Sequence, residues 1–482
     1  DEIGKAGVER TYEAYLRGRP GRRVYEISRT GRVVRELVDQ RVEPRNGDDV
    51  YLSIDARIQY KTEAALQAQI AKSKSPTPYG AATVLDPRNG QIVAMASYPT
   101  YDPSTLVGGI SQDEYESLTK APEKVLSNRN IQEAYPAAST FKLASSFAGY
   151  KLGIIDPDQY VLDNGSYRLC AGNGSGCLKR NAGGTAHGSV NLTSSLIVSS
   201  DVYSYRIGDL AWKGRERWGD DALQREIEKL GYGHKTGIDL TAESPGLIPT
   251  PETNKEIAEK LWEKSHENYD NDPEKFRDAQ LWRGGNSADL AIGQGSVGVT
   301  PLQTANAYAA LANARSIQYR PSVLKVVTAS HDPSAIHKAY VAKELRRVDF
   351  GTAKQAFLDG FAGVVQSASP RGTAYSVFRT FPLSTFEVSG KTGTAEVGDE
   401  SAKRRDNSLF VAYGPNPDNK YVVSVMIQGG GFGASAAAPT AYMILEPIAD
   451  GSIESFEVPK GGAIDTDAVV EDAEKIQSTG SD

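Results

Sequence analysis

Residues 81–96 contain the stretch on which the rest of the chain can be organised: Ala81-Ala82-Thr83-Val84-Leu85, then Asp86-Pro87-Arg88-Asn89-Gly90, then Ile92-Val93-Ala94-Met95-Ala96. Two apolar runs flank a segment ending in Asn-Gly, the dipeptide that supplies the positive φ angles of a tight turn. Apolar runs of this length, bounded by turn residues, are typical of β-strands. The stretch therefore predicts a β-hairpin.

Further strand signals appear only near the end of the chain. Residues 386–389, 409–413 and 421–427 form apolar segments separated by turn-rich loops, which favours an antiparallel meander. Residues 54–70 have apolar positions at helical spacing, and residues 143–314 are mostly helical segments and polar loops. Early strands, a long helical middle and late strands predict one sheet assembled from both ends of a large domain, with helices packed on it.

Composition narrows the class of protein. Of the 482 residues, 24% are charged and 39% hydrophobic, which is typical of a folded soluble protein and excludes a disordered one. The net charge of -7 is concentrated in residues 451–482, which hold eight acids and two lysines. The rest is nearly neutral, so no basic excess would recruit nucleic acid. We expect an N-terminal β-containing segment over 1–49, a main domain over 50–450 and an acidic tail over 451–482.

Two uncharged stretches, 290–314 and 421–445, are long enough to be considered as membrane spans. Glycines and polar residues interrupt both stretches, so neither is apolar enough for the hydrocarbon core of a bilayer. The chain begins Asp1-Glu2-Ile3-Gly4, which is neither an initiator methionine nor a signal peptide. We therefore expect a trimmed chain whose targeting segment is missing.

The two cysteines, Cys170 and Cys177, are seven residues apart in a stretch rich in Gly, Asn and Ser. A disulfide closing this short loop would fit an oxidising compartment, whereas two free thiols are the alternative, and the sequence leaves both open. The five histidines are scattered, and no Cys/His cluster has zinc spacing. We expect no metal site.

Ser139 and Lys142 stand three positions apart at the start of an apolar segment. If a helix begins there, both side chains share a face, so the Lys142 amine can reach the Ser139 hydroxyl. The N-terminus of a helix also places backbone N–H groups and a positive dipole near a developing oxyanion. A lysine acts as a base only when neutral, so its pKa must be lowered by burial or by a neighbouring cation.

The Ser-x-x-Lys spacing is weak evidence alone, because Ser117-Lys120 and Ser322-Lys325 repeat it in the same chain. A second motif distinguishes Ser139. Lys391-Thr392-Gly393-Thr394 follows Val388-Ser389-Gly390 on a predicted strand, where a cation, two hydroxyls and a backbone without a side chain could receive a carboxylate-ended peptide as an added strand.

With these motifs the chain resembles the class B penicillin-binding proteins, which are D,D-transpeptidases, over roughly residues 4–442. The resemblance also rests on further pieces in the family's order: Asn128-Arg129, His187-Gly188, Gly293-Gln294-Gly295, Gly372-Thr373-Ala374 and Ala438-Pro439. It implies an α/β penicillin-binding transpeptidase fold, in which a five-stranded antiparallel sheet lies between helical layers, with a small N-terminal β-containing pedestal.

The resemblance implies that Ser139 is the nucleophile, Lys142 its base, and the N–H groups of Ser139 and Thr394 the oxyanion hole. Lys391, Thr392 and Thr394, with Gly393 between them, would bind the substrate carboxylate. Ser199 would relay the proton to the leaving amine.

The family's third motif, Ser-x-Asn, is where this sequence departs from the pattern. We interpret Ser199-Ser200-Asp201 as its counterpart, although a literal Ser189-Val190-Asn191 lies ten residues earlier, because of the interval from His187-Gly188. An ionised Asp201 would raise the pKa of Lys142, so we hypothesise a coupled Lys142-Asp201-Lys391 network in which the second lysine offsets the carboxylate. We leave the 293–295 loop and His187 outside the site, as packing and structural residues.

The resemblance implies a serine-type D-Ala-D-Ala transpeptidase that cross-links peptidoglycan stem peptides through an acyl-enzyme, needs no cofactor and is acylated by β-lactam antibiotics. The implied location is the extracytoplasmic face of the bacterial cytoplasmic membrane. The single-pass N-terminal anchor would be absent from this chain, and a lipid-linked glycan polymerase of the SEDS type would be the partner. Residues 199–203 look more like the elongation type, similar to penicillin-binding protein 2, than the division type. The alternatives are a β-lactam-hydrolysing serine enzyme and a non-catalytic β-lactam sensor or scaffold.

Overall fold

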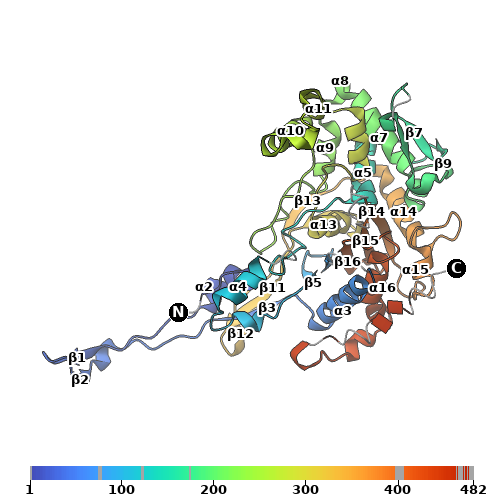
Figure 1. Ribbon diagram of the computed structural model, residues 1–482. Helices are drawn as coiled ribbons and strands as arrows, with labels where there is room; N and C mark the ends of the chain where they lie inside the picture. Colours follow the sequence, from blue (N-terminus) through green and yellow to red (C-terminus); the bar gives the residue numbers. More distant parts are fainter. Residues whose placement is uncertain are drawn as a thin grey trace.

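The computed structural model describes residues 3–73, 79–120, 124–172, 175–396 and 406–462, and beyond these only 464, 470, 471, 473, 474 and 476. Figure 1 shows a large body and a narrow arm, with β1 (Tyr25–Ile27) and β2 (Val33–Glu36) at the far end of the arm. Of the acidic tail expected over 451–482, residues 463, 465–469, 472, 475 and 477–482 lie outside the described residues. No helix in the described part of the chain is both long and apolar enough to cross a bilayer.

A five-stranded antiparallel sheet forms the centre of the body, as predicted. Its strand order is β14-β15-β16-β4-β5. The first pair in sequence, β4 (Gly80–Leu85) and β5 (Ile92–Tyr98), is the expected hairpin, and the other strands are β14 (Ser389–Ala395), β15 (Asn407–Gly414) and β16 (Tyr421–Ile427). The two ends of the chain meet where β16 pairs with β4, so the sheet is assembled from both ends.

One predicted strand lies further along the chain than expected. Residues 386–388 precede β14, which starts at Ser389 and includes the whole Lys391–Thr394 motif. The ladder begins where Ser389 pairs with Tyr413. Beyond it, Pro415 has no N–H to donate, and the Asn416 N–H donates to the Glu387 carbonyl at 3.0 Å. The motif is therefore part of the sheet, on a strand as predicted.

Helices cover both faces of the sheet. On one face lie α3 (Ala56–Ser73) and α16 (Ala437–Ala449), and on the other lies α13 (Pro301–Ala312), every residue of which is buried. Alternate residues of β15 serve the two faces, because successive side chains of a strand point to opposite sides. Phe410 and Ala412 belong to the hydrophobic cluster with α3 and α16, whereas Val411 and Tyr413 belong to the cluster with α13.

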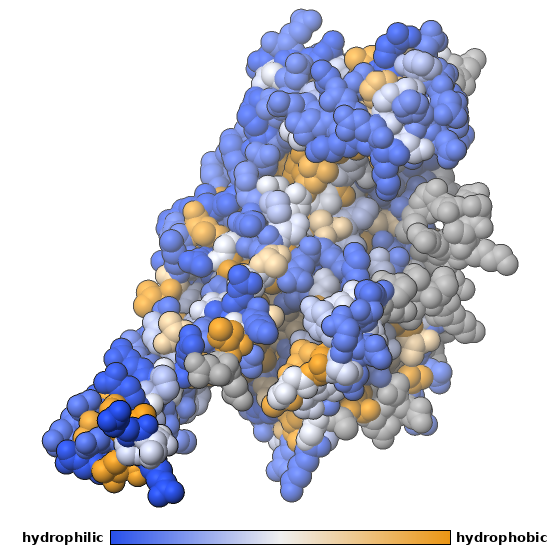
Figure 2. All heavy atoms as spheres, turned by 60° about the vertical axis from the view of Figure 1, so that its left-hand side comes forward, coloured by the Kyte–Doolittle hydropathy of each residue, from blue (hydrophilic) through white to orange (hydrophobic). Residues whose placement is uncertain are grey.

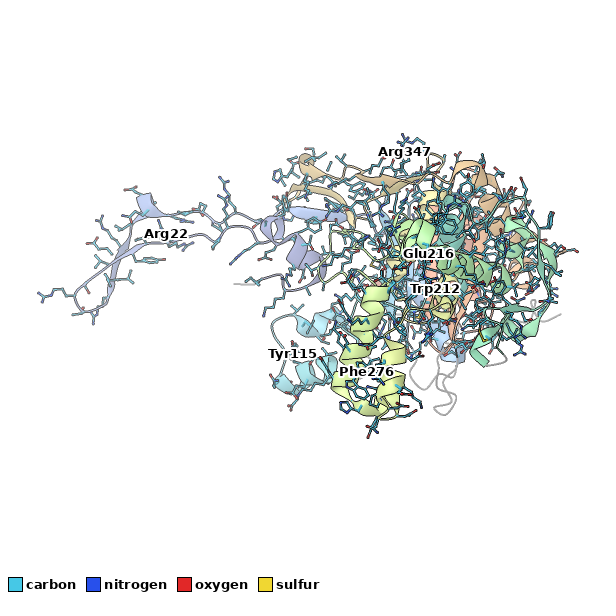
Figure 3. The ribbon with its side chains drawn as sticks, turned by 90° about the horizontal axis from the view of Figure 1, so that it is seen from above. Arg22, Tyr115, Trp212, Glu216, Phe276 and Arg347 are labelled. Carbon is cyan, nitrogen blue, oxygen red and sulfur yellow. A yellow bond between two sulfur atoms is a disulfide. The ribbon has the colours of Figure 1, made fainter. Side chains whose placement is uncertain are left out.

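The middle of the chain is mostly helical, as predicted. After α4 (Gln112–Thr119), its helices are α5 (Lys142–Lys151), α6 (Leu192–Ile197), α7 (Asp201–Lys213), α8 (Arg215–Trp218), α9 (Ala222–Glu228), α10 (Pro251–Lys264), α11 (Pro273–Ala279), α12 (Gly284–Ala291) and α13. Two short ladders interrupt them: β6 (Val161–Asp163) with β9 (Gly188–Val190), and β7 (Ser166–Arg168) with β8 (Leu178–Arg180). Figure 3 shows Trp212 and Glu216 within this helical part, with Tyr115 of α4 and Phe276 of α11 on its flank.

Cys170 and Cys177 form a disulfide at the tip of the β7–β8 hairpin. The structure thus selects the disulfide from the two states that the sequence left open. Next to it, Leu169 donates a backbone hydrogen bond of 2.8 Å to Cys177, which continues the ladder outward. The covalent bond closes a hairpin whose strands are only three residues long.

The N-terminal segment joins the body through α1 (Gly7–Thr11), α2 (Glu13–Leu16) and β3 (Asp49–Leu52). β3 pairs with β11 (Leu324–Ala329), which also pairs with β12 (Asp332–Ala339). Beyond this anchor the arm extends away from the body, as Arg22 marks in Figure 3. Figure 2 shows apolar side chains at the tip of the arm, where Ile27 and Val33 are each 64% exposed.

The last elements complete the layers around the sheet. β10 (Ile317–Tyr319) pairs with β13 (Glu344–Arg347) after α13. Next come α14 (Lys354–Gln366), which packs against β14, and α15 (Tyr375–Phe378), which packs against α14 and α16. This confirms the predicted fold class: a five-stranded antiparallel sheet between helical layers, with a small N-terminal β-containing part.

Candidate active site

A cleft of about 770 Å³ opens between the sheet edge and the helical part of the body. Six of the eight residues predicted for the site line it: Ser139, Ser199, Asp201, Thr392, Gly393 and Thr394. The other two, Lys142 and Lys391, are buried behind its wall, at 1% and 0% exposure. The structure therefore brings all three sequence motifs to one place.

Ser139 lies in a 3₁₀ turn, η3 (Ala138–Phe141), that leads into α5. The predicted helix start is thus a tighter turn followed by the α-helix. Ala138 has φ +47°, in the left-handed region that only a constrained non-glycine residue adopts. Its N–H donates a hydrogen bond of 2.9 Å to the Gly293 carbonyl, which helps to hold the turn. Ser139 itself is partly exposed to the cleft.

Lys142 is directed at the third motif. Its Nζ donates hydrogen bonds to the Ser199 carbonyl at 2.7 Å, to Ser199 Oγ at 3.2 Å and to Asp201 Oδ1 at 2.7 Å. Ser199 has φ +58°, and in this left-handed conformation both its carbonyl and its hydroxyl reach the same amine. Within the part of the chain that the structure describes, Ser139 Oγ is not among the hydrogen-bond partners of Lys142.

Burial lowers the pKa of both lysines. Burial lowers the pKa of Lys142, against the opposing effects of the Asp201 and Asp163 carboxylates. Burial and the charge of Lys142 hold the pKa of Lys391 well below its ordinary value, and Asp201 again opposes the shift. Lys391 Nζ donates to Ser199 Oγ at 2.7 Å, so one hydroxyl connects the two amines.

The Lys391–Thr394 motif lies on β14, the edge strand of the sheet. Gly393 packs directly on the turn that carries Ser139, since a β-carbon there would lie 3.1 Å from Thr140 Cγ2 and 3.3 Å from the Ala137 carbonyl. Thr392 Oγ1 is 2.7 Å from Thr373 Oγ1, which fixes its hydroxyl. An edge strand has unpaired backbone groups that an extended peptide can bond.

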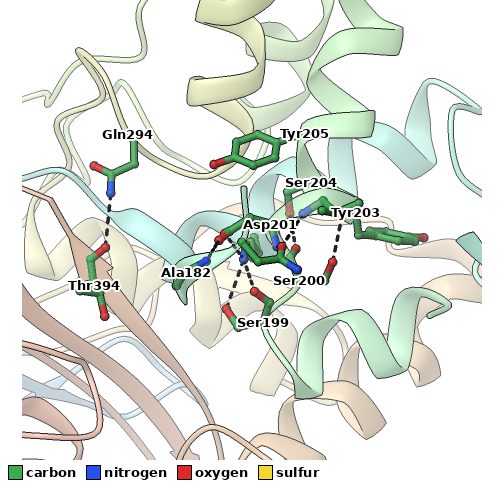
Figure 4. A network of polar contacts seen from close by, with 12 residues as sticks. Ala182, Ser199, Ser200, Asp201, Tyr203, Ser204, Tyr205, Gln294 and Thr394 are labelled. Carbon is green, nitrogen blue, oxygen red and sulfur yellow. Dashed lines mark hydrogen bonds and ion pairs between the residues drawn. The ribbon is translucent and has the colours of Figure 1, made fainter. Parts of the chain in front are cut away.

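Several residues of the cleft were not predicted. Gln294, in the 293–295 loop that we placed outside the site, lines the cleft and donates to the Thr394 carbonyl at 3.3 Å, as Figure 4 shows. The loop was visible in the sequence, but nothing there indicated which element it contacts. Asn181 and Ala182 also line the cleft and had no sequence signal. His187 lines it too, and its backbone N–H bonds the Asp163 carbonyl at 3.1 Å.

The segment Ser199-Ser200-Asp201, which we interpret as the third motif, lies at the cleft. Its first and third residues line the cleft, whereas Ser189 is an exposed residue of β9 and Asn191 caps the N-terminus of α6. The described residues contain no cluster of three or more His, Cys, Asp or Glu side chains arranged to hold a metal ion.

Comparison with known proteins places this arrangement among the penicillin-binding proteins. Residues 80–446 match the penicillin-binding protein transpeptidase domain, and residues 1–52 match the penicillin-binding protein dimerisation domain. The peptidoglycan D,D-transpeptidase MrdA of Acinetobacter baumannii is 32% identical over 449 residues, a match covering 90% of this chain and 59% of the relative. The chain thus spans about three fifths of the length of that curated relative.

Two solved structures are similar as well. Pseudomonas aeruginosa PBP2 in complex with WCK 5153 has a TM-score of 0.68 and 30% identity, covering 92% of this chain and 81% of the other. The second is described as the structural coordination of polymerization and crosslinking by a peptidoglycan synthase complex. It has a TM-score of 0.74 and 26% identity, and the match covers 95% of this chain and 72% of the other.

Proposed function

The chain belongs to the penicillin-binding protein transpeptidase family, and we propose that it is a serine D,D-transpeptidase that cross-links peptidoglycan stem peptides through an acyl-enzyme on Ser139. The observation that carries the proposal is the convergence of the Ser139, Ser199 and Lys391 motifs on one cleft. The relatives support the elongation type, similar to penicillin-binding protein 2.

In the proposed acylation, Ser139 Oγ attacks the carbonyl of the penultimate D-alanine. Lys142 accepts the hydroxyl proton, and the developing oxyanion receives hydrogen bonds from the N–H groups of Ser139 and Thr394. The C–N bond to the last D-alanine breaks, and its nitrogen takes a proton through Ser199, so free D-alanine leaves. The products are an ester on Ser139 and one released amino acid.

The contacts of Lys142 suggest how it becomes a base. As an ammonium it has three N–H bonds, which match its three acceptors on Ser199 and Asp201. A neutral amine has two N–H bonds and one lone pair, so one contact must be given up. The contact to Ser199 Oγ is the longest, at 3.2 Å, and Lys391 can retain that hydroxyl at 2.7 Å. The freed lone pair is then available to the Ser139 proton.

The second half-reaction transfers the acyl group to an amine of a neighbouring stem peptide, which attacks the ester and releases Ser139. Lys391, Thr392 and Thr394 bind the terminal carboxylate of the first substrate, and β14 offers its edge to the peptide backbone. A β-lactam places its strained amide where the D-Ala-D-Ala bond would lie, so it acylates the same serine. Both half-reactions use only the side chains and backbone N–H groups named above.

The remaining parts of the proposal concern the whole protein. We propose that residues 1–49 are part of a pedestal, that 50–450 form the transpeptidase domain and that 451–482 are an acidic tail. The protein would act on the extracytoplasmic face of the bacterial cytoplasmic membrane, held there by an N-terminal anchor. Its partner would be a SEDS-type glycan polymerase, which is in keeping with a similar structure that concerns a peptidoglycan synthase complex.

The test is cross-linking of lipid-linked precursor in the presence of a glycan polymerase, comparing the native chain with Ser139→Ala. We expect cross-linked product only from the native chain, and product from the alanine variant would refute the assignment. The lifetime of the adduct with a fluorescent penicillin separates the alternatives. Rapid turnover would favour a β-lactam-hydrolysing enzyme, and a stable adduct without cross-linking would favour a sensor or scaffold.

A further inference from the structure

A buried polar network lies directly behind Asp201, and it begins where the β7–β8 hairpin ends. Asn181 follows β8 immediately and is 4% exposed. Its Oδ1 accepts hydrogen bonds of 2.9 Å from the N–H groups of both Asp201 and Val202, the first two residues of α7. These N–H groups have no partner within a helix, so a side chain from another element satisfies both.

The other end of the Asn181 side chain is equally fixed. Its Nδ2 donates to both oxygens of Asp163, at 2.8 and 2.9 Å, and to the Thr185 carbonyl at 2.7 Å. Asp163 is fully buried and also accepts from Ser200 Oγ at 2.6 Å. A flipped amide would turn its oxygen towards this buried carboxylate, so only one orientation of Asn181 is favourable.

Ala182, the residue after Asn181, contacts the carboxylate of Asp201. Figure 4 shows Ala182 beside Asp201, where the Ala182 N–H donates to Oδ2 at 3.3 Å. The other carboxylate oxygen, Oδ1, accepts from Lys142 at 2.7 Å. Both oxygens of Asp201 therefore have a partner, and the Asn181-Ala182 pair holds both the backbone and the carboxylate of this residue.

The hairpin that carries Asn181 is itself secured on two helices. Tyr167 donates to Asp209 of α7 at 2.7 Å, and Lys179 forms an ion pair of 2.7 Å with Asp289 of α12. The disulfide closes the far end of the hairpin. The hairpin that precedes Asn181 is therefore held in place. A residue that positions other residues must itself be held in place.

We propose that Asn181 is a positioning residue for the transpeptidase reaction. It fixes the backbone of Asp201, and through that backbone it keeps the Asp201 carboxylate against Lys142 and so sets how readily Lys142 accepts the Ser139 proton. The inference rests on the proposed function. It assigns a role to the β7–β8 hairpin, which is otherwise remote from the reacting serine in the sequence.

Three charged groups face Lys142, each from a different element: Asp201 from α7, Asp163 from β6 and Lys391 from β14. Asp201 raises the pKa of Lys142, against burial, which lowers it. When Asn181 is removed, Asp201 is less firmly held and its effect weakens, so the pKa of Lys142 falls further. More of the amine is then neutral at low pH, and the acid limb of the acylation profile moves to lower pH.

The experiment measures the rate of acylation by a fluorescent penicillin as a function of pH for the native chain and Asn181→Ala. We expect a maximal rate about tenfold lower, because the base is less well placed. We also expect a ratio of variant to native rate that rises as the pH falls. Asn164→Ala is the matched control, because Asn164 is an exposed asparagine between β6 and β7. It should reproduce the native profile.

The same substitution in an Asp201→Asn background distinguishes positioning from general damage. If Asn181 acts through Asp201, adding Asn181→Ala to Asp201→Asn leaves the shape of the pH profile unchanged. A native profile for Asn181→Ala alone, or a further shift in the double variant, would overturn the proposal. If Asn181→Ala melts far below the native chain, Asn181→Ser takes its place in both comparisons. Absence of acylation in the native chain would instead contradict the proposed function.

Discussion

Lys391 donates a hydrogen bond of 2.7 Å to the hydroxyl of Ser199, although 192 residues separate the two in the chain. Lys142 donates to the same oxygen at 3.2 Å. One serine hydroxyl thus lies between two buried amines, with Asp201 as the carboxylate that opposes the fall in both their pKa values. This agrees with the hypothesis of a coupled network and adds Ser199 as its central member.

Removal of the Ser199 hydroxyl should therefore slow acylation by about a hundredfold, because it takes away the proton relay and the group that connects the amines. The measurement is the acylation rate of Ser199→Ala with a fluorescent penicillin. Ser189→Ala is the control, since Ser189 begins the literal Ser-x-Asn sequence but is an exposed residue of β9. A large loss in Ser189→Ala and none in Ser199→Ala would show that the third motif was assigned wrongly.

Asp201→Asn should move the acid limb of acylation to lower pH. The carboxylate raises the pKa of Lys142, so its loss lets burial lower that pKa further, and the amine stays neutral into more acidic solution. The ratio of the variant's rate to the native rate should accordingly rise as the pH falls. Superimposable profiles, after scaling for a uniform loss of rate, would contradict the coupled network.

Gly393→Ala should impair acylation by moving β14 away from the turn that carries Ser139. A β-carbon at this position meets Thr140 Cγ2 at 3.1 Å and Leu409 Cβ at 3.2 Å, so either the strand or the turn must shift. We expect a destabilisation of about 1–3 kcal/mol and a clear loss of acylation rate. Gly285→Ala is the control, because a β-carbon there has no neighbour within 4 Å. Equal acylation rates for the two variants would argue against the close packing of β14 on η3.

Loss of the disulfide should loosen the β7–β8 hairpin. Without the bond the unfolded chain gains conformational entropy, which for a loop of this size lowers the free energy of unfolding by about 2 kcal/mol. The double variant Cys170→Ser, Cys177→Ser should show faster amide exchange over 166–180 and a lower melting temperature than the native chain. Since Asn181 follows β8, the acylation rate should also fall. Unchanged exchange across the hairpin would mean that its helix contacts suffice without the covalent bond.

The sequence predicted the main features of the fold because they depend on local patterns. The Asn89-Gly90 turn between two apolar runs forms the expected hairpin, and Gly90 has the required positive φ of +87°. The late strands pair as a meander, and the helix expected over 54–70 is α3. Alternation and helical spacing are properties of neighbouring residues, so they can be read without knowing what those residues pack against.

The network around the cleft could not be predicted in the same way. The sequence identified Ser139, Lys142, Ser199, Asp201 and the Lys391–Thr394 motif through residue type and resemblance, but it placed Lys142 towards Ser139. In the structure its hydrogen bonds go to Ser199 and Asp201. Gln294 was noted only as part of a packing loop, and Asn181 was not noted at all. Their contacts depend on elements that approach from distant parts of the chain.

By itself, the sequence determined the hairpin, the late meander, a sheet built from both ends of the chain, and which residue types could carry out acyl transfer. The tertiary structure decided that both lysines are buried beside one hydroxyl, that Asn181 holds the backbone of Asp201, and that the Ala182 N–H holds its carboxylate. The physical reason is that local patterns follow from the chain's own geometry, whereas the pKa of a buried amine depends on the charges and the solvent that folding brings to it or removes.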